Sequence, residues 1–206
     1  MLTAIKAYSS LLIRTASDKL STGVWWLLAL LTFAQARVAQ IWLDGFYARS
    51  EFPVPYYIGQ TRFNGETIKG YYQVLIEKGT LDIYVQTQLV DYVFMAATFL
   101  SFFCLAAAVM RSVRSVFTEG WLLSIARVFV WLAPCAAVMD ALENLVSFFM
   151  LANPTDFADW LAIPYSAFAV SKFAIFAATY AWVLVAIVVC LMGLIWKLAL
   201  RLRARA

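Results

Sequence analysis

The sequence lacks histidine and contains few charged residues, and each shortage excludes a class of protein. Only 14% of its 206 residues are charged, whereas 64% are hydrophobic. Soluble domains carry roughly a quarter charged residues, so an ordinary soluble domain is excluded. The absence of histidine removes the commonest metal ligand and the usual general base. We therefore expect no metal site and no cofactor.

Cysteine is also scarce, and its spacing excludes a redox or metal motif. Cys104, Cys135 and Cys190 stand alone within apolar runs. We expect all three to be buried and to pack as small hydrophobic residues. The net charge of +4 does not indicate a nucleic-acid partner, because the basic residues gather at the ends of apolar runs.

Long apolar runs dominate the chain and predict an all-α, polytopic membrane protein. Four runs each have the roughly 20 residues that a bilayer crossing needs. We expect them to form one antiparallel four-helix transmembrane bundle, a single membrane domain over residues 1–206, and Pro134 to kink the third helix. The expected spans cover about residues 24–44, 81–110, 121–151 and 160–198.

Two alternatives stay open at the beginning of the chain. Residues 1–21 are basic and form either an amphipathic helix on the membrane surface or a plain basic tail. The first apolar run resembles a signal-peptide core, and Ala34-Gln35-Ala36 fits a cleavage site. We expect an uncleaved helix, because the apolar character resumes through Leu43; cleavage after Ala36 is the alternative.

Residues 45–80 form the one substantial segment outside the predicted spans. Its first part contains Pro53 and Pro55 and predicts an irregular aromatic loop. Asn64 is a suitable N-cap for a short amphipathic helix that Gly79 would end. We expect this helix to lie on the extracytoplasmic side, between the first and second spans.

The distribution of lysine and arginine predicts the orientation. Basic residues are concentrated in the N-terminal tail, in the Arg111–Arg114 connection and in the C-terminal tail. The connection between the third and fourth spans has none. Cytoplasmic loops carry the excess of positive charge, so both termini are expected in the cytoplasm.

Each predicted span carries charge at a similar depth. Asp140, Glu143 and Asn144 form a D-x-x-E-N motif, and spacings of three and four place them on one helix face. Counted from the outer ends of the spans, the charged residues lie roughly 10–15 Å below the outer surface. The candidate site residues are Arg37, Asp91, Asp140, Glu143, Asn144 and Lys172.

Two interpretations fit this charged layer. It is either a buried ion-pair network that fixes helix register or a polar pocket that binds a ligand. A short loop joins the third and fourth spans, so residues equally far from that loop lie at equal depth. This counting predicts that Lys172 pairs with Asp140 and Glu143.

The motifs resemble a family of small bacterial four-helix membrane proteins of unknown function. The resemblance covers roughly residues 64–200 and rests on Asp91 in LVDYVFM, the motif in MDALENL, Lys172 in VSKFAIF and the helix end EKGTLDIY. The chain differs in lacking the proline that follows the aspartate in that family, which favours a straighter second helix. The resemblance implies the layout, the site residues and a location in the bacterial inner (plasma) membrane, and no activity.

The function we expect is the binding or movement of a small polar or amphipathic ligand through the outer-leaflet pocket. The expected partners are membrane lipids and such a ligand, and no nucleic acid. One alternative is an intramembrane enzyme that uses Asp140 or Glu143 as an acid/base on a lipid or isoprenoid. The other is a structural subunit whose polar layer docks a membrane-protein partner.

Overall fold

The fold, taken from a computed structural model that describes residues 20–204, is all-α, and it contains no strand within that range. Four helical segments are long and apolar enough to cross a membrane, which confirms the predicted fold class. The alternatives for the basic N-terminal segment fall almost wholly outside the described residues. The four segments are α2 (Thr22–Ser50), α5 (Leu81–Val116), α6 with α7 (Trp121–Leu132 and Cys135–Leu151) and α8 (Ala162–Arg203).

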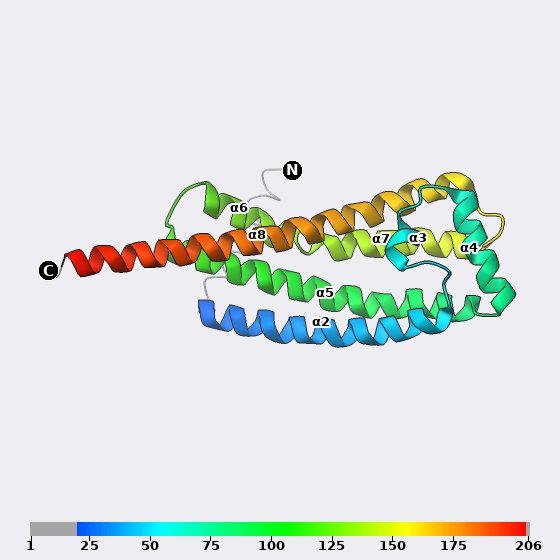
Figure 1. The fold of residues 1–206 in the computed structure, drawn as a ribbon, viewed down its shortest axis with the longest axis horizontal. Helices are drawn as coiled ribbons and strands as arrows, with labels where there is room; N and C mark the ends of the chain where they lie inside the picture. The colour runs from blue at the N-terminus through cyan, green and yellow to red at the C-terminus, as the bar shows by residue number, and fades with distance from the viewer. Residues whose placement is uncertain (1–19, 205–206) are drawn as a thin grey trace, which may run out of the picture.

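Helix α5 lies at the centre of the bundle. It packs against α2 along most of its length and also contacts α6, α7 and α8 (Figure 1). Its buried face includes the run Ala106–Ala108, and α2 meets it with Ala29, Ala36 and Ala39. Small residues let helix backbones approach closely, so α2 and α5 form a tight antiparallel pair. Helices α7 and α8 form the second pair.

Pro134 interrupts the third apolar run, as predicted. Helix α6 ends at Leu132 and α7 begins at Cys135. Proline lacks a backbone N–H and its ring clashes with the preceding turn, so the helical hydrogen bonds are broken there. Helix α5, which has no proline, is continuous over 36 residues.

A short helix, α4 (Gly65–Lys78), crosses one end of the bundle, and we call this the α4 end (Figure 1). Asn64 Oδ1 accepts a hydrogen bond from the Thr67 N–H at 2.7 Å, and Gly79 ends the helix with φ +69°. Both ends of this helix are therefore confirmed. Two small elements complete this end: α3 (Tyr56–Gln60) and the 3₁₀ turn η1 (Asp159–Leu161).

Several helices extend beyond the predicted spans. Helix α2 continues to Ser50, so the irregular loop expected from Gly45 begins six residues later. Within this extension the Arg49 guanidinium lies 4.2 Å from the Phe46 ring, a contact between neighbouring positions of one helix face. Helix α5 likewise continues past Met110 to Val116. Charged residues limit the length of a membrane-spanning segment, but they do not end the helix itself.

Aromatic packing and polar contacts fasten the α4 end to the long helices. The Phe52 and Tyr84 rings are stacked with centroids 4.9 Å apart. The Ser166 hydroxyl on α8 accepts a hydrogen bond from the Phe63 N–H at 3.0 Å, where the backbone has φ +53°. This end of the bundle therefore has a defined arrangement.

The three cysteines are not all buried. Cys104 and Cys190 are buried as expected, whereas Cys135 is half-buried. Its thiol donates to the Trp131 carbonyl oxygen at 3.1 Å. The expectation of full burial was wrong for Cys135, because Ala136 and Ala137 hold the buried positions at the start of α7 and Cys135 lies on the side of exposed Trp131 and Val138.

Candidate functional site

The centre of the site is one lysine held by two carboxylates. Lys172 Nζ on α8 lies 2.5 Å from Asp140 Oδ1 and 2.6 Å from Glu143 Oε2, both on α7. Only 5% of the lysine side chain, 5% of the aspartate and none of the glutamate is exposed. This confirms the pairing predicted by counting outward from the turn between the third and fourth spans.

A second polar contact joins α7 to α5. Asn144 Nδ2 donates to Asp91 Oδ2 at 3.0 Å and to the Gln88 carbonyl oxygen at 3.3 Å. All three residues are buried. The D-x-x-E-N motif therefore contacts two different helices: its acids reach Lys172 on α8, and its amide reaches α5.

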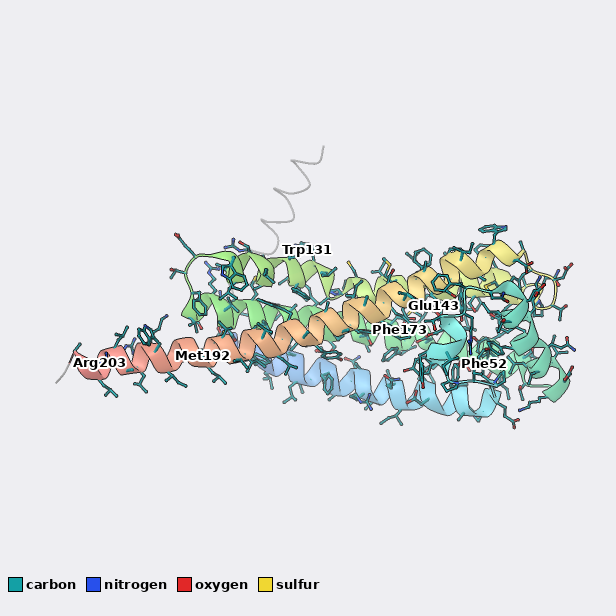
Figure 2. The ribbon with its side chains drawn as sticks, turned by 45° about the horizontal axis from the view of Figure 1, so that its top comes forward. Phe52, Trp131, Glu143, Phe173, Met192 and Arg203 are labelled. Atoms are coloured by element: carbon teal, nitrogen blue, oxygen red, sulfur yellow. The ribbon has the colours of Figure 1, made fainter. Side chains whose placement is uncertain are left out.

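Helical spacing explains how one motif serves both neighbours. Residues three and four apart lie on one face, and Asp140, Glu143, Asn144 and Ser147 are all buried. This buried face of α7 lies between α5 and α8, both of which α7 contacts. Figure 2 shows Glu143 in the same half of the bundle as Phe52 and Phe173, away from Met192 and Arg203.

Arg37 is the candidate residue that the structure does not bring into this cluster. It is exposed on α2, and it forms no ion pair or hydrogen bond with any residue in the described range. We expected it to balance the acids. Instead, three carboxylates (Asp91, Asp140 and Glu143) share one ammonium group, that of Lys172. The cluster therefore carries surplus negative charge when its acids are ionised.

A cavity of about 630 Å³ adjoins the cluster. Pockets for small ligands typically measure about 300–1,000 Å³. Its walls come from α2 and α8, which do not pack extensively against each other, and its floor comes from α5. Asp91, Asp140 and Lys172 line it, whereas Glu143 and Asn144 lie behind the wall.

The cavity changes in character along the bundle. Near the α4 end its lining is polar, and farther along the helices it becomes largely aromatic. From Lys172 to Tyr180, two of its lining residues, α8 advances roughly 12 Å. The aromatic part is lined by Phe33, Phe94, Phe102, Phe173, Phe176 and Tyr180. The lining of the cavity is thus amphipathic, with a polar part and an apolar part.

The sequence did not predict the residues that line the cavity at the α4 end. Tyr47, Tyr56 and Gln60 line the cavity there. Burial, followed by the Asp44 carboxylate, raises the pKa of the Tyr56 phenol above its ordinary value, so the hydroxyl stays protonated at neutral pH. Two of these residues lie in the proline-containing segment, whose path no periodicity predicts.

The remaining chemistry of the site is limited. Among the residues that the structure describes, no group of three acidic or cysteine side chains is arranged to hold a metal ion. The site can hold charge, donate and accept hydrogen bonds and enclose an apolar chain.

Comparisons with known proteins find no match to any family model, curated protein or solved structure. The resemblance to small four-helix bacterial membrane proteins therefore stays a prediction, carried by the motif residues alone.

Proposed function

We propose that this chain is an integral membrane protein that binds an amphipathic ligand in the cavity between α2 and α8. The observation that carries the proposal is the single 630 Å³ space lined by buried charges at one end and phenyl rings at the other. A purely structural ion-pair network does not require a cavity beside it. A ligand with a polar head and an apolar chain matches both parts.

The route of entry supports a ligand from the membrane. The cavity lies between α2 and α8, and both helices carry large exposed apolar residues, including Leu30, Val38 and Leu184. In a bilayer such faces lie against lipid. An amphiphile can therefore enter sideways, without its chain crossing water.

The proposed orientation places both termini in the cytoplasm and the α4 end outside, in a bacterial inner membrane. Arg111, Arg114 and the basic C-terminal residues of α8 gather at the opposite end from α4. This is the distribution that cytoplasmic ends carry. A reporter active only in the cytoplasm, fused to the C-terminus, should be active; activity of a periplasm-specific reporter would contradict this orientation.

Mass spectrometry of molecules that co-purify with the protein tests the binding proposal. We expect an amphiphile with the full-length chain and its loss in Gln40→Trp, because Gln40 lines the cavity and tryptophan would fill it. The matched control is Val38→Trp, two positions away on α2, where the side chain is 68% exposed and outside the cavity lining. Equal ligand content in both variants would contradict the proposal.

An intramembrane enzyme is the second candidate, because Asp91 and Asp140 both face the cavity. A carboxyl group kept neutral by an apolar environment can protonate an alkene or ether. Lipid analysis of a deletion strain separates the two classes: an accumulated precursor favours the enzyme, and an unchanged lipid profile favours binding.

A further inference from the structure

The cavity wall carries charges of both signs that form no ion pair among the residues that the structure describes, and they lie at different depths. Lys172 forms ion pairs with Asp140 and Glu143, so it is not free to bind an anion. Within residues 20–204, the Asp91 carboxylate accepts one side-chain hydrogen bond, from the neutral Asn144 amide to Oδ2, and forms no ion pair. Arg37, also on the wall, forms no ion pair with any residue in the described part of the chain.

The depth of the two charges follows from the packing of α2 on α5. Ala36 and Ala39 of α2 pack with Ala97 of α5, and the helices run in opposite directions. Asp91 is therefore nearly level with residues 42–45 of α2. Counting along α2, Arg37 begins roughly 8–12 Å farther from the α4 end than Asp91. The acid lies toward the α4 end and the guanidinium toward the aromatic part.

Buried polar atoms in the same wall still lack partners. Gln88 is 3% exposed and Gln60 is 8% exposed, and both line the cavity. The Oε1 of each has no hydrogen-bond partner between residues 20 and 204. Both atoms are acceptors, and both lie on the α4 side of Arg37. A buried acceptor without a donor is costly, so this part of the cavity suits a group that brings N–H donors.

Together these features give an order along the cavity: acceptors and a carboxylate, then a guanidinium, then aromatic rings. A carboxylate and unpaired acceptors bind a protonated amine, and a guanidinium binds a phosphate through paired hydrogen bonds. The rings suit a hydrocarbon chain. A membrane lipid with its head toward the α4 end presents amine, phosphate and chain in this same order.

We propose, building on the proposed binding function, that the ligand is a zwitterionic amphiphile with a primary amine and a phosphate. The amine contacts Asp91 and the glutamine acceptors, the phosphate contacts Arg37, and the chain lies along Phe102 and Phe176. A quaternary ammonium group has no N–H and leaves the glutamine acceptors unpaired. An anionic lipid without the amine leaves Asp91 uncompensated.

Native mass spectrometry of the full-length protein in detergent, with single-chain probes of equal chain length, tests this proposal. The probes are lysophosphatidylethanolamine, lysophosphatidylcholine, lysophosphatidylglycerol and monoacylglycerol. We expect the ethanolamine probe to bind at least about tenfold more tightly than each of the others, the factor expected for one charged hydrogen bond. Equal binding of the glycerol phospholipid would overturn the zwitterion proposal.

Two variants test which charged side chain contacts the amine and which contacts the phosphate. Asp91→Asn keeps an acceptor for Asn144 and should lower the affinity of the ethanolamine probe about tenfold without weakening the phosphatidylglycerol probe. Arg37→Gln, at an exposed position, should weaken all three phosphate probes and leave monoacylglycerol unchanged. If neither variant alters the order of probes, the charge assignment is wrong.

The same series separates this proposal from the function on which it rests. If all four probes, monoacylglycerol included, bind equally and Gln40→Trp weakens them all, the cavity binds amphiphiles but does not read the headgroup. If no probe binds, both the headgroup proposal and the binding function are contradicted.

Discussion

Lys172 Nζ lies 2.6 Å from Glu143 Oε2 across the interface of α8 and α7, and the glutamate side chain is fully buried. Removing the lysine leaves carboxylates without a counter-charge in a low-dielectric interior. We expect Lys172→Met to lower the free energy of unfolding by about 3 kcal/mol. A denaturant series in detergent measures this loss.

The control for this prediction is Lys197→Met, because Lys197 is exposed on the same helix and its change should stay within about 0.5 kcal/mol. Adding Glu143→Gln to Lys172→Met should recover part of the loss, since it removes one of the stranded charges. Simple addition of the two single effects would show that the pair does not act as a unit.

The hydrogen bond between Asn144 and Asp91 can be tested by exchanging its two members. Asn144→Asp replaces the amide donor by an acid beside Asp91, and we expect a loss of about 1–3 kcal/mol in unfolding free energy. The double variant Asn144→Asp/Asp91→Asn restores an amide and a carboxylate and should be more stable than Asn144→Asp alone. A double variant no better than the single one would argue against this contact.

Two glycines of α4 make a matched pair for testing how the α4 end is fastened. A Cβ at Gly65 would lie 2.8 Å from the Asp159 Cα, whereas a Cβ at Gly70 meets nothing within 4 Å. Asp159 also forms a 2.7 Å ion pair with Lys69, so displacing it disturbs both contacts. We expect Gly65→Ala to destabilise the protein by about 1–3 kcal/mol, measured by thermal unfolding.

Gly70→Ala should instead be neutral or stabilising by up to about 1 kcal/mol, because alanine is the better helix former. The contrast between the two substitutions is the prediction. Equal effects would show that α4 does not press against η1.

The intact mass of the purified protein tests whether the first span is retained. Trp25, Ala29 and Ala36 are buried in the packing of α2. Loss of residues 1–36 would remove much of that face. We therefore expect the full 23.2 kDa chain; a product that begins at Arg37 would contradict the four-span arrangement.

The parts of the site that the sequence predicted are those in which short connections fix geometry. A short turn joins α7 to α8, so equal counts from that turn place Lys172 beside Glu143. Helical spacing alone places Asn144 on the same buried face. The N-cap at Asn64 could also be predicted, because it depends only on one side chain and the nearest backbone N–H groups.

The parts that could not be predicted depend on the rotation of a helix about its axis and on segments without regular secondary structure. A long segment separates α2 from α5, so no turn fixes the rotation of α2, and Arg37 was assigned to an ion-pair network that it does not join. The cavity walls at Tyr56 and Gln60 lie in a segment without periodicity. The cavity itself results from the separation of α2 and α8, which no sequence pattern predicts.

The binding proposal requires an amphiphile in the cavity with its chain among the aromatic residues. Photo-crosslinking in lipid nanodiscs can detect this, with a lysophosphatidylethanolamine probe that carries a diazirine at its chain end. We predict labelling of peptides that contain Phe102, Phe176 and Tyr180, reduced in Gln40→Trp and retained in Val38→Trp. Labelling spread over the exposed residues between Leu184 and Leu202, and equal in both variants, would contradict this proposal.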